Sequence, residues 1–248
     1  MDNSTSVGPK ETAWKALYIT GGVAALIAVI FFRRYLSAEL MAFNGFGIFD
    51  VPKAAPVTAI EWFTLFQKNK FVGLALLDIF DLVNYALVGL IFLALYAALR
   101  KSNQSVMGLA TIINIVGTTV YFASNQAFSF LYLSEQYAAA TSEMQRSLYL
   151  AAGEALLANT HGTGIHISLF LVLLAGLIVS IVMLGSNIFN KTTAVTRILA
   201  NGFGLGYFIL LILAPAISWL PPTLSAPFRI IWYILIAIKL FKLGKDSK

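Results

Sequence analysis

The 248-residue sequence contains no cysteine and carries little charge. Without cysteine the chain can form no disulfide, no thiolate metal site and no cysteine nucleophile, so its redox compartment cannot be inferred. Only 11% of the residues are charged, whereas ordinary soluble domains are about one-quarter charged. With 59% apolar residues and a mean hydropathy of +0.82, a soluble fold could not cover its surface. The composition therefore predicts an integral membrane protein.

Motifs of known enzyme chemistry are also missing from the sequence. It has no glycine-flanked serine, no His-Glu-x-x-His, no P-loop and no haem-attachment motif. We therefore expect no cofactor, and the sequence favours a protein without enzymatic activity while leaving an enzyme as an open alternative. The net charge of +6 would suggest nucleic acid as the partner of a soluble protein. In a membrane protein its distribution between loops reports orientation instead, so we expect the lipid bilayer as partner and no nucleic acid.

Six apolar stretches approach the length that a membrane helix needs, which is about 20 residues. They predict an all-α fold, a bundle of six transmembrane helices. The predicted spans are residues 14–32, 76–99, 105–130, 164–184, 194–214 and 226–240. Between the last two, the Pro221-Pro222 pair predicts a turn. We assign residues 14–243 to a single transmembrane domain, preceded by a disordered polar tail (1–13) and followed by a basic tail (244–248).

An even number of spans places both termini on one side of the membrane. The loops on that side are short, and the side carries many basic residues, among them Arg100, Lys101, Lys191 and Arg197. Basic residues in short loops mark the cytoplasmic side, so we expect both termini in the cytoplasm of a cell-membrane protein. The pair Arg33-Arg34, which follows the first span, argues the other way.

Two connections on the outer side have the patterns of amphipathic helices. In residues 57–69, VTAIEWFTLFQKN, apolar residues recur every third position, and Trp62 beside Glu61 suits the headgroup region. Residues 142–159 begin with polar residues and continue with leucines. We expect the first to be a helix at the outer interface and the second to be an amphipathic helix that leads into the fourth span.

The polar residues within the predicted spans gather at the outer ends of four helices. Asp78, Asp81, Asn84 and Tyr85 share one side of the second span if it is one continuous helix. At similar depth we expect Asn125 from the third span and His166 from the fourth, with Glu154, His161 and Arg229 close by. Buried polar groups in a bundle are functional candidates, and these predict an outward-facing polar pocket. Alternatively, the two aspartates only complement the helix dipole.

A metal site and a polar path are further readings of the same spans. His161 and His166 are five residues apart, whereas a helical histidine pair requires a spacing of four, so a site with Asp81 is a weak prediction. The third span carries Asn114, Thr118 and Asn125, which would line a path or form interhelical hydrogen bonds. In the fifth span, Gly202 and Gly206 have the spacing that lets helices approach closely.

Two segments carry a resemblance to a known family. The segment LLDIFD, which leads into FLALYAALRKSN, is the first. The second is the block HGTGIHISLFLVLLAGLIVSIVMLGSNIFNKTTAVTRILANGFGLGYF. Both resemble prokaryotic integral membrane proteins of the domain of unknown function 4386 family, over about residues 14–243. The resemblance implies a multi-pass membrane protein and supplies no activity, substrate or catalytic residue.

Three functions follow as hypotheses. The first is a carrier or receptor for a small polar solute or ion, with Asp78 and Asp81 as cation or proton sites and His166 as a relay. The second is a structural or interaction protein that docks a partner on its outer helices. An intramembrane metal-dependent enzyme is the third.

Overall fold

The structure is a computed structural model that describes residues 12–31, 52 and 54–246. Every regular element in those residues is a helix, which confirms the all-α prediction. Five helical runs are long and apolar enough to cross a membrane, as the composition predicts. They are Ile79–Leu99, Gln104–Ala139, Glu143–Leu184, Lys191–Leu213 and Pro215–Asp246. The first predicted span falls on a shorter apolar stretch, Trp14–Val29, so a bundle of six spans stays a prediction.

The second predicted span is interrupted near its start. Helix α4 (Lys70–Leu76) ends at the first residue of this span, and helix α5 (Ile79–Leu99) begins only after Asp78. Asp78 itself has φ 61°, a left-handed conformation that aspartate adopts more easily than most residues. The assumption of one continuous helix through Asp78 and Asp81 is therefore wrong.

The third predicted span also breaks. Helix α6 (Gln104–Ser124) stops at Asn125-Gln126, and helix α7 (Ala127–Ala139) follows. The stretch that follows the third predicted span is mostly helical. Helix α8 (Glu143–Asn159) occupies the predicted helix at 142–159, and helix α3 (Ala59–Lys68) the one at 57–69. Their placement at a membrane interface stays a prediction.

The last helices differ from the prediction at the proline pair. Helix α9 is Thr163–Leu184 and helix α10 is Lys191–Leu213. A short 3-10 turn, η1 (Pro215–Ile217), then leads into helix α11 (Leu220–Asp246). Pro221 and Pro222 lie in the first turn of α11, where the missing N–H groups cost no hydrogen bond. The prediction that this pair makes the turn is wrong, because the chain turns just before it.

The chain divides into two compact units. The first unit is residues 1–30, 86–116 and 170–248, and the second unit is residues 31–85 and 117–169. Helices α5, α6 and α9 each contribute to both. The single transmembrane domain at 14–243 stays a prediction.

The two predicted tails are only partly described. Residues 1–11 of the N-terminal tail and the last two residues of the C-terminal tail lie outside the described residues, as do Arg33 and Arg34. Helix α1 begins inside that N-terminal tail (Thr12–Phe31), and α11 extends into the C-terminal one.

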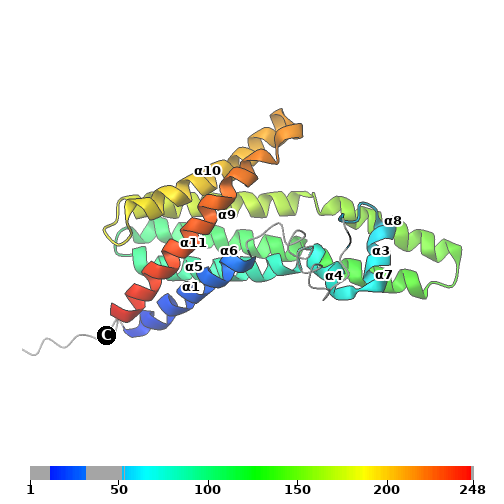
Figure 1. The fold of residues 1–248 in the computed structure, drawn as a ribbon, viewed down its shortest axis with the longest axis horizontal. Helices are drawn as coiled ribbons and strands as arrows, with labels where there is room; N and C mark the ends of the chain where they lie inside the picture. Colours follow the sequence, from blue (N-terminus) through cyan, green and yellow to red (C-terminus); the bar gives the residue numbers. More distant parts are fainter. Residues whose placement is uncertain (1–11, 32–51, 53, 247–248) are drawn as a thin grey trace, which may run out of the picture. The chain divides into compact units, whose positions relative to one another are not determined.

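In the second unit, helices α3, α7 and α8 pack together (Figure 1). Their core is aromatic: the rings of Trp62 and Phe63 on α3 each lie 6.2 Å from the ring of Phe130 on α7. Glu154 on α8 accepts a hydrogen bond of 2.8 Å from the backbone N–H of Ala59, the first residue of α3. A carboxylate from another helix thus satisfies one of the free N–H groups at this helix start.

In the first unit, α10 and α11 form an antiparallel hairpin (Figure 1). Phe203 and Phe228 stack across it with ring centroids 5.8 Å apart. Gly206 faces Pro221 of α11 at van der Waals distance, whereas Gly202 faces open space. The prediction that helices approach closely at both glycines is therefore wrong for Gly202, because no other described helix lies against it.

Candidate functional site

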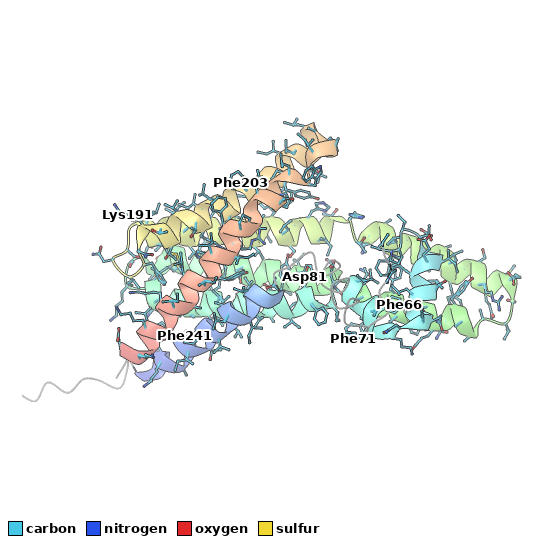
Figure 2. The ribbon with its side chains drawn as sticks, in the orientation of Figure 1. Phe66, Phe71, Asp81, Lys191, Phe203 and Phe241 are labelled. Carbon is cyan, nitrogen blue, oxygen red and sulfur yellow. The ribbon has the colours of Figure 1, made fainter. Side chains whose placement is uncertain are left out.

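The polar residues of α5 lie on its buried side. Asp81 is in the first turn of the helix and is half-buried (Figure 2). Asn84 and Tyr85 follow it by three and four positions, the spacing that brings side chains onto one helix face. Asn84 is 9% exposed. Because α5 begins only after Asp78, Asp81, Asn84 and Tyr85 share one face of this helix, whereas the exposed Asp78 lies outside it.

A matching polar face on α6 meets them. Tyr121 stacks on Tyr85 with ring centroids 3.9 Å apart and planes 3° from parallel. The Tyr121 side chain hydrogen-bonds with Asn125 and lies within electrostatic range of both Asp81 and Asp78. Thr118, one turn before Tyr121, is buried. We call the six residues Asp81, Asn84, Tyr85, Thr118, Tyr121 and Asn125 the α5–α6 polar cluster; all belong to the second unit.

The two helix breaks lie beside this cluster and contact each other. The Asn125 side-chain amide donates to the backbone carbonyl of Asp78 at 3.4 Å, and its oxygen accepts from the N–H of Ala127, the first residue of α7, at 3.1 Å. One side chain therefore connects the α4–α5 break to the α6–α7 break. Interrupted helices at polar sites are typical of transporter binding sites, because their ends expose backbone groups for a ligand.

Several buried polar atoms in the second unit have no hydrogen-bond partner among the described residues. In the cluster these are Asn84 Oδ1 and Thr118 Oγ1, and Ser168 Oγ on α9 is a third. Buried polar groups normally find a partner, because leaving one unsatisfied costs about 1–3 kcal/mol. In the first unit, both amide atoms of Asn114 are unsatisfied as well. The interhelical hydrogen bonds expected of Asn114 and Thr118 are therefore not formed by the described residues.

The two histidines lie near the start of α9. His161 is exposed in the turn before the helix. His166 is half-buried, and its Nδ1 lies 3.0 Å from the carbonyl oxygen of Gly162. Within the residues that the structure describes, no group of three or more His, Asp or Glu side chains has the geometry to hold a metal ion. Participation of His166 in the cluster and a metal site with Asp81 stay predictions.

Other residues expected near the cluster have different roles. Glu154 caps α3, as described above, and Arg229 belongs to the first unit, where it donates to the hydroxyl of Ser225 at 3.1 Å. Tyr121, by contrast, was not among the candidates from the sequence. It lies three residues after Thr118 and four before Asn125, so its position on the polar face of α6 was visible in the helical spacing.

No protein-family model, curated protein or solved structure matches this chain. The resemblance to the domain of unknown function 4386 family therefore stays a prediction.

Proposed function

We propose that this chain is a multi-pass protein of the cell membrane that binds a small cation or protonated polar solute at the α5–α6 polar cluster, as a carrier or receptor. The observation that carries the proposal is the pair of unsatisfied buried oxygens, Asn84 Oδ1 on the α5 face that carries Asp81 and Thr118 Oγ1 one turn before Tyr121 on α6. A ligand with hydrogen-bond donors or positive charge would satisfy them.

The chemistry of the cluster favours a cation over an anion. Asp81 contributes a carboxylate, Asn84 an amide oxygen and Thr118 a hydroxyl oxygen. Carboxylate, amide and hydroxyl oxygens are the groups that hard cations prefer as ligands. An ionisable residue inside a membrane bundle is costly and is a functional candidate for that reason.

Helix lengths support an extramembrane position for α7 and α8. The helix pairs α6–α7 and α8–α9 cover Gln104–Ala139 and Glu143–Leu184, which are 36 and 42 residues, whereas about 20 suffice to cross the hydrocarbon core. If α6 and α9 cross the membrane, α7 and α8 extend beyond it on one side. The cluster at the α6–α7 junction would then lie near the outer surface and open outward.

The test is a thermal-unfolding titration of the purified protein in neutral detergent. Sodium, potassium and methylammonium chlorides are compared at equal ionic strength with bulky tetrabutylammonium chloride. We expect one of the small cations to raise the unfolding temperature saturably, and Asp81→Asn to abolish the rise with expression unchanged. Glu143→Gln, an exposed charge-matched change on α8, should respond like wild type. Equal responses in wild type and Asp81→Asn would contradict the proposal.

The alternative is an interaction protein that does not transport. Its support is an apolar pair on α8, Met144 and Leu148, which are 76% and 65% exposed and share one face. In that case Asp81→Asn changes no cation response, while Met144→Ser with Leu148→Ser removes a partner from the purified complex. The metal-dependent enzyme remains third, and zinc retained through purification and lost in His166→Ala would support it.

A further inference from the structure

A second polar cluster lies in the first unit, among α9, α10 and α11. Arg197 on α10 is only 3% exposed, and its guanidinium carbon lies 4.1 Å above the ring of Trp232 on α11. Its side chain also hydrogen-bonds with Tyr233. Counted from Lys191, the first residue of α10, Arg197 is roughly 9 Å along the helix. The structure thus places a buried cation inside a candidate membrane span.

The donors of this cluster are not all satisfied. Arg197 Nε and Trp232 Nε1 are buried and have no hydrogen-bond partner among the described residues. Asn201, four residues after Arg197 and on the same face of α10, is fully buried, with both amide atoms unpartnered. The unsatisfied groups are N–H donors except for the Asn201 oxygen. A ligand that pairs with these groups must therefore offer hydrogen-bond acceptors.

The described residues of the first unit place no carboxylate near Arg197 to neutralise it. Asp246 is the unit's only acidic residue within the described ranges, at the far end of α11. Fourteen residues separate Asp246 from Trp232, which is roughly 20 Å along the helix. A buried charge without a counter-charge is strongly unfavourable in a membrane bundle.

Arg229 adds a second cationic side chain nearby. It donates to the Ser225 hydroxyl, which in turn donates to the carbonyl of Ala200 at 2.7 Å, next to Asn201. On α9, a Cβ atom at Gly176 would lie 2.6 Å from Asn201 Nδ2 and 2.9 Å from Arg197 Nη2. Only glycine at this position lets both side chains lie against the α9 backbone, which fixes where their donors stand.

We propose that the Arg197 cluster, formed by Arg197, Asn201, Trp232 and Arg229, binds an oxyanion, a carboxylate or phosphate group. The planar guanidinium offers paired N–H donors that match two oxygens of such a group, and the Asn201 amide and the Trp232 indole add further donors. The oxyanion supplies the missing negative charge. Free anions and the phosphate of an acidic lipid headgroup share this chemistry.

The first experiment is thermal unfolding of the full chain in neutral detergent. One arm titrates sodium phosphate and sodium acetate against sodium chloride at equal ionic strength. The other adds phosphatidylglycerol to the micelles, with phosphatidylcholine as control. A saturable rise in the first arm identifies a free oxyanion, and a rise with phosphatidylglycerol alone identifies a headgroup. No rise in either arm overturns the proposal.

Two variants within the Arg197 cluster and two controls outside it test where the anion binds. Asn201→Leu keeps the side-chain size and removes the amide, and we expect its apparent affinity for the stabilising anion to fall at least tenfold. Arg197→Gln should lose the response, and Lys191→Gln, an exposed charge-matched change on the same helix, should keep it. If Arg197→Gln does not fold, Asn201→Leu decides; a wild-type response there overturns the proposal. Asp81→Asn should keep the anion response, so this test is independent of the cation test.

Discussion

Tyr85 and Tyr121 lie face to face, with ring centroids 3.9 Å apart and planes 3° from parallel. Aromatic pairs usually prefer an offset or edge-on arrangement at 4.5–7 Å, so neighbouring contacts must hold these rings together. Asn125 is one such contact, because it hydrogen-bonds with Tyr121 and connects the two adjacent helix breaks. The stack thus connects α5 and α6 at the candidate cation site.

The first prediction separates the ring of Tyr121 from its hydroxyl. Tyr121→Phe keeps the stack and loses the bond to Asn125, so we expect a stability loss of about 1 kcal/mol. Tyr121→Leu loses both, and we expect about 2–3 kcal/mol more. Denaturant unfolding in mixed micelles measures the difference. Phe122→Leu, at an exposed position on the same helix, serves as the control and should change little; equal losses for the two Tyr121 variants would show that the ring is unimportant.

The second prediction concerns the left-handed residue Asp78. Glycine accepts φ 61° without cost and asparagine nearly so, whereas a β-branched side chain at a left-handed position is disfavoured by roughly 1–2 kcal/mol or more. Asp78→Gly and Asp78→Asn should therefore unfold at the wild-type temperature or above, and Asp78→Val well below it. A Val variant as stable as the Gly variant would mean that the break between α4 and α5 does not require this conformation.

The third prediction is a pH dependence at the start of α3. The N–H groups of Val57 and Thr58 donate to the Glu61 carboxylate at 2.7 and 3.2 Å, which lowers the pKa of Glu61 below its ordinary value of 4.5. The ionised form therefore stabilises this helix start above the ordinary pKa, and that contribution is lost as the pH falls through the lowered pKa.

Hydrogen exchange of the Val57 and Thr58 amides, followed by NMR, measures this effect. After correction for intrinsic exchange, their protection should fall as acid protonates Glu61. In Glu61→Gln the amide oxygen still accepts hydrogen bonds but does not titrate, so the protection should be independent of pH. An acid-induced loss that persists in this variant would assign the effect to another group.

The fourth prediction compares two glycines. Gly176→Ala would place a Cβ 2.6 Å from Asn201 Nδ2, so we expect overpacking to cost about 1–3 kcal/mol and the oxyanion response to weaken. Gly202→Ala meets open space in the middle of α10 and should stabilise by up to about 1 kcal/mol, because alanine favours the helix. Thermal unfolding of both variants tests the pair; opposite signs are expected.

The sequence predicts the helical class and the positions of most long apolar helices because long apolar runs are strong, local signals. It misplaces helix breaks because those depend on neighbours. A proline pair is compatible both with a turn and with the first turn of a helix, and Pro221-Pro222 adopts the second. Nothing local in LLDIFD determines that Asp78 leaves the helix. The backbone carbonyl of Asp78 accepts a hydrogen bond from Asn125, which lies 47 residues further along the chain.

The candidate sites illustrate the same limit. Asp81, Asn84 and Tyr85 are visible as one face from their spacing, and Tyr121 could have been added from its spacing to Asn125. Arg197 and Asn201 have the same four-residue spacing within a predicted span. Their importance depends on the absence of a nearby carboxylate in the described first unit and on Gly176 of another helix. Those facts come from tertiary packing, which a single sequence does not contain.

The hydrogen bond from the Ala59 N–H to Glu154 bridges 95 residues of sequence. Ribosomes add about 5–20 residues per second, so α3 is made roughly 5–20 s before the carboxylate that caps it. During that interval Trp62 and Phe63 also lack Phe130, the aromatic partner that α7 supplies. Helix α3 therefore leaves the ribosome with its apolar face uncovered, and its docking must wait until α7 and α8 have been synthesised.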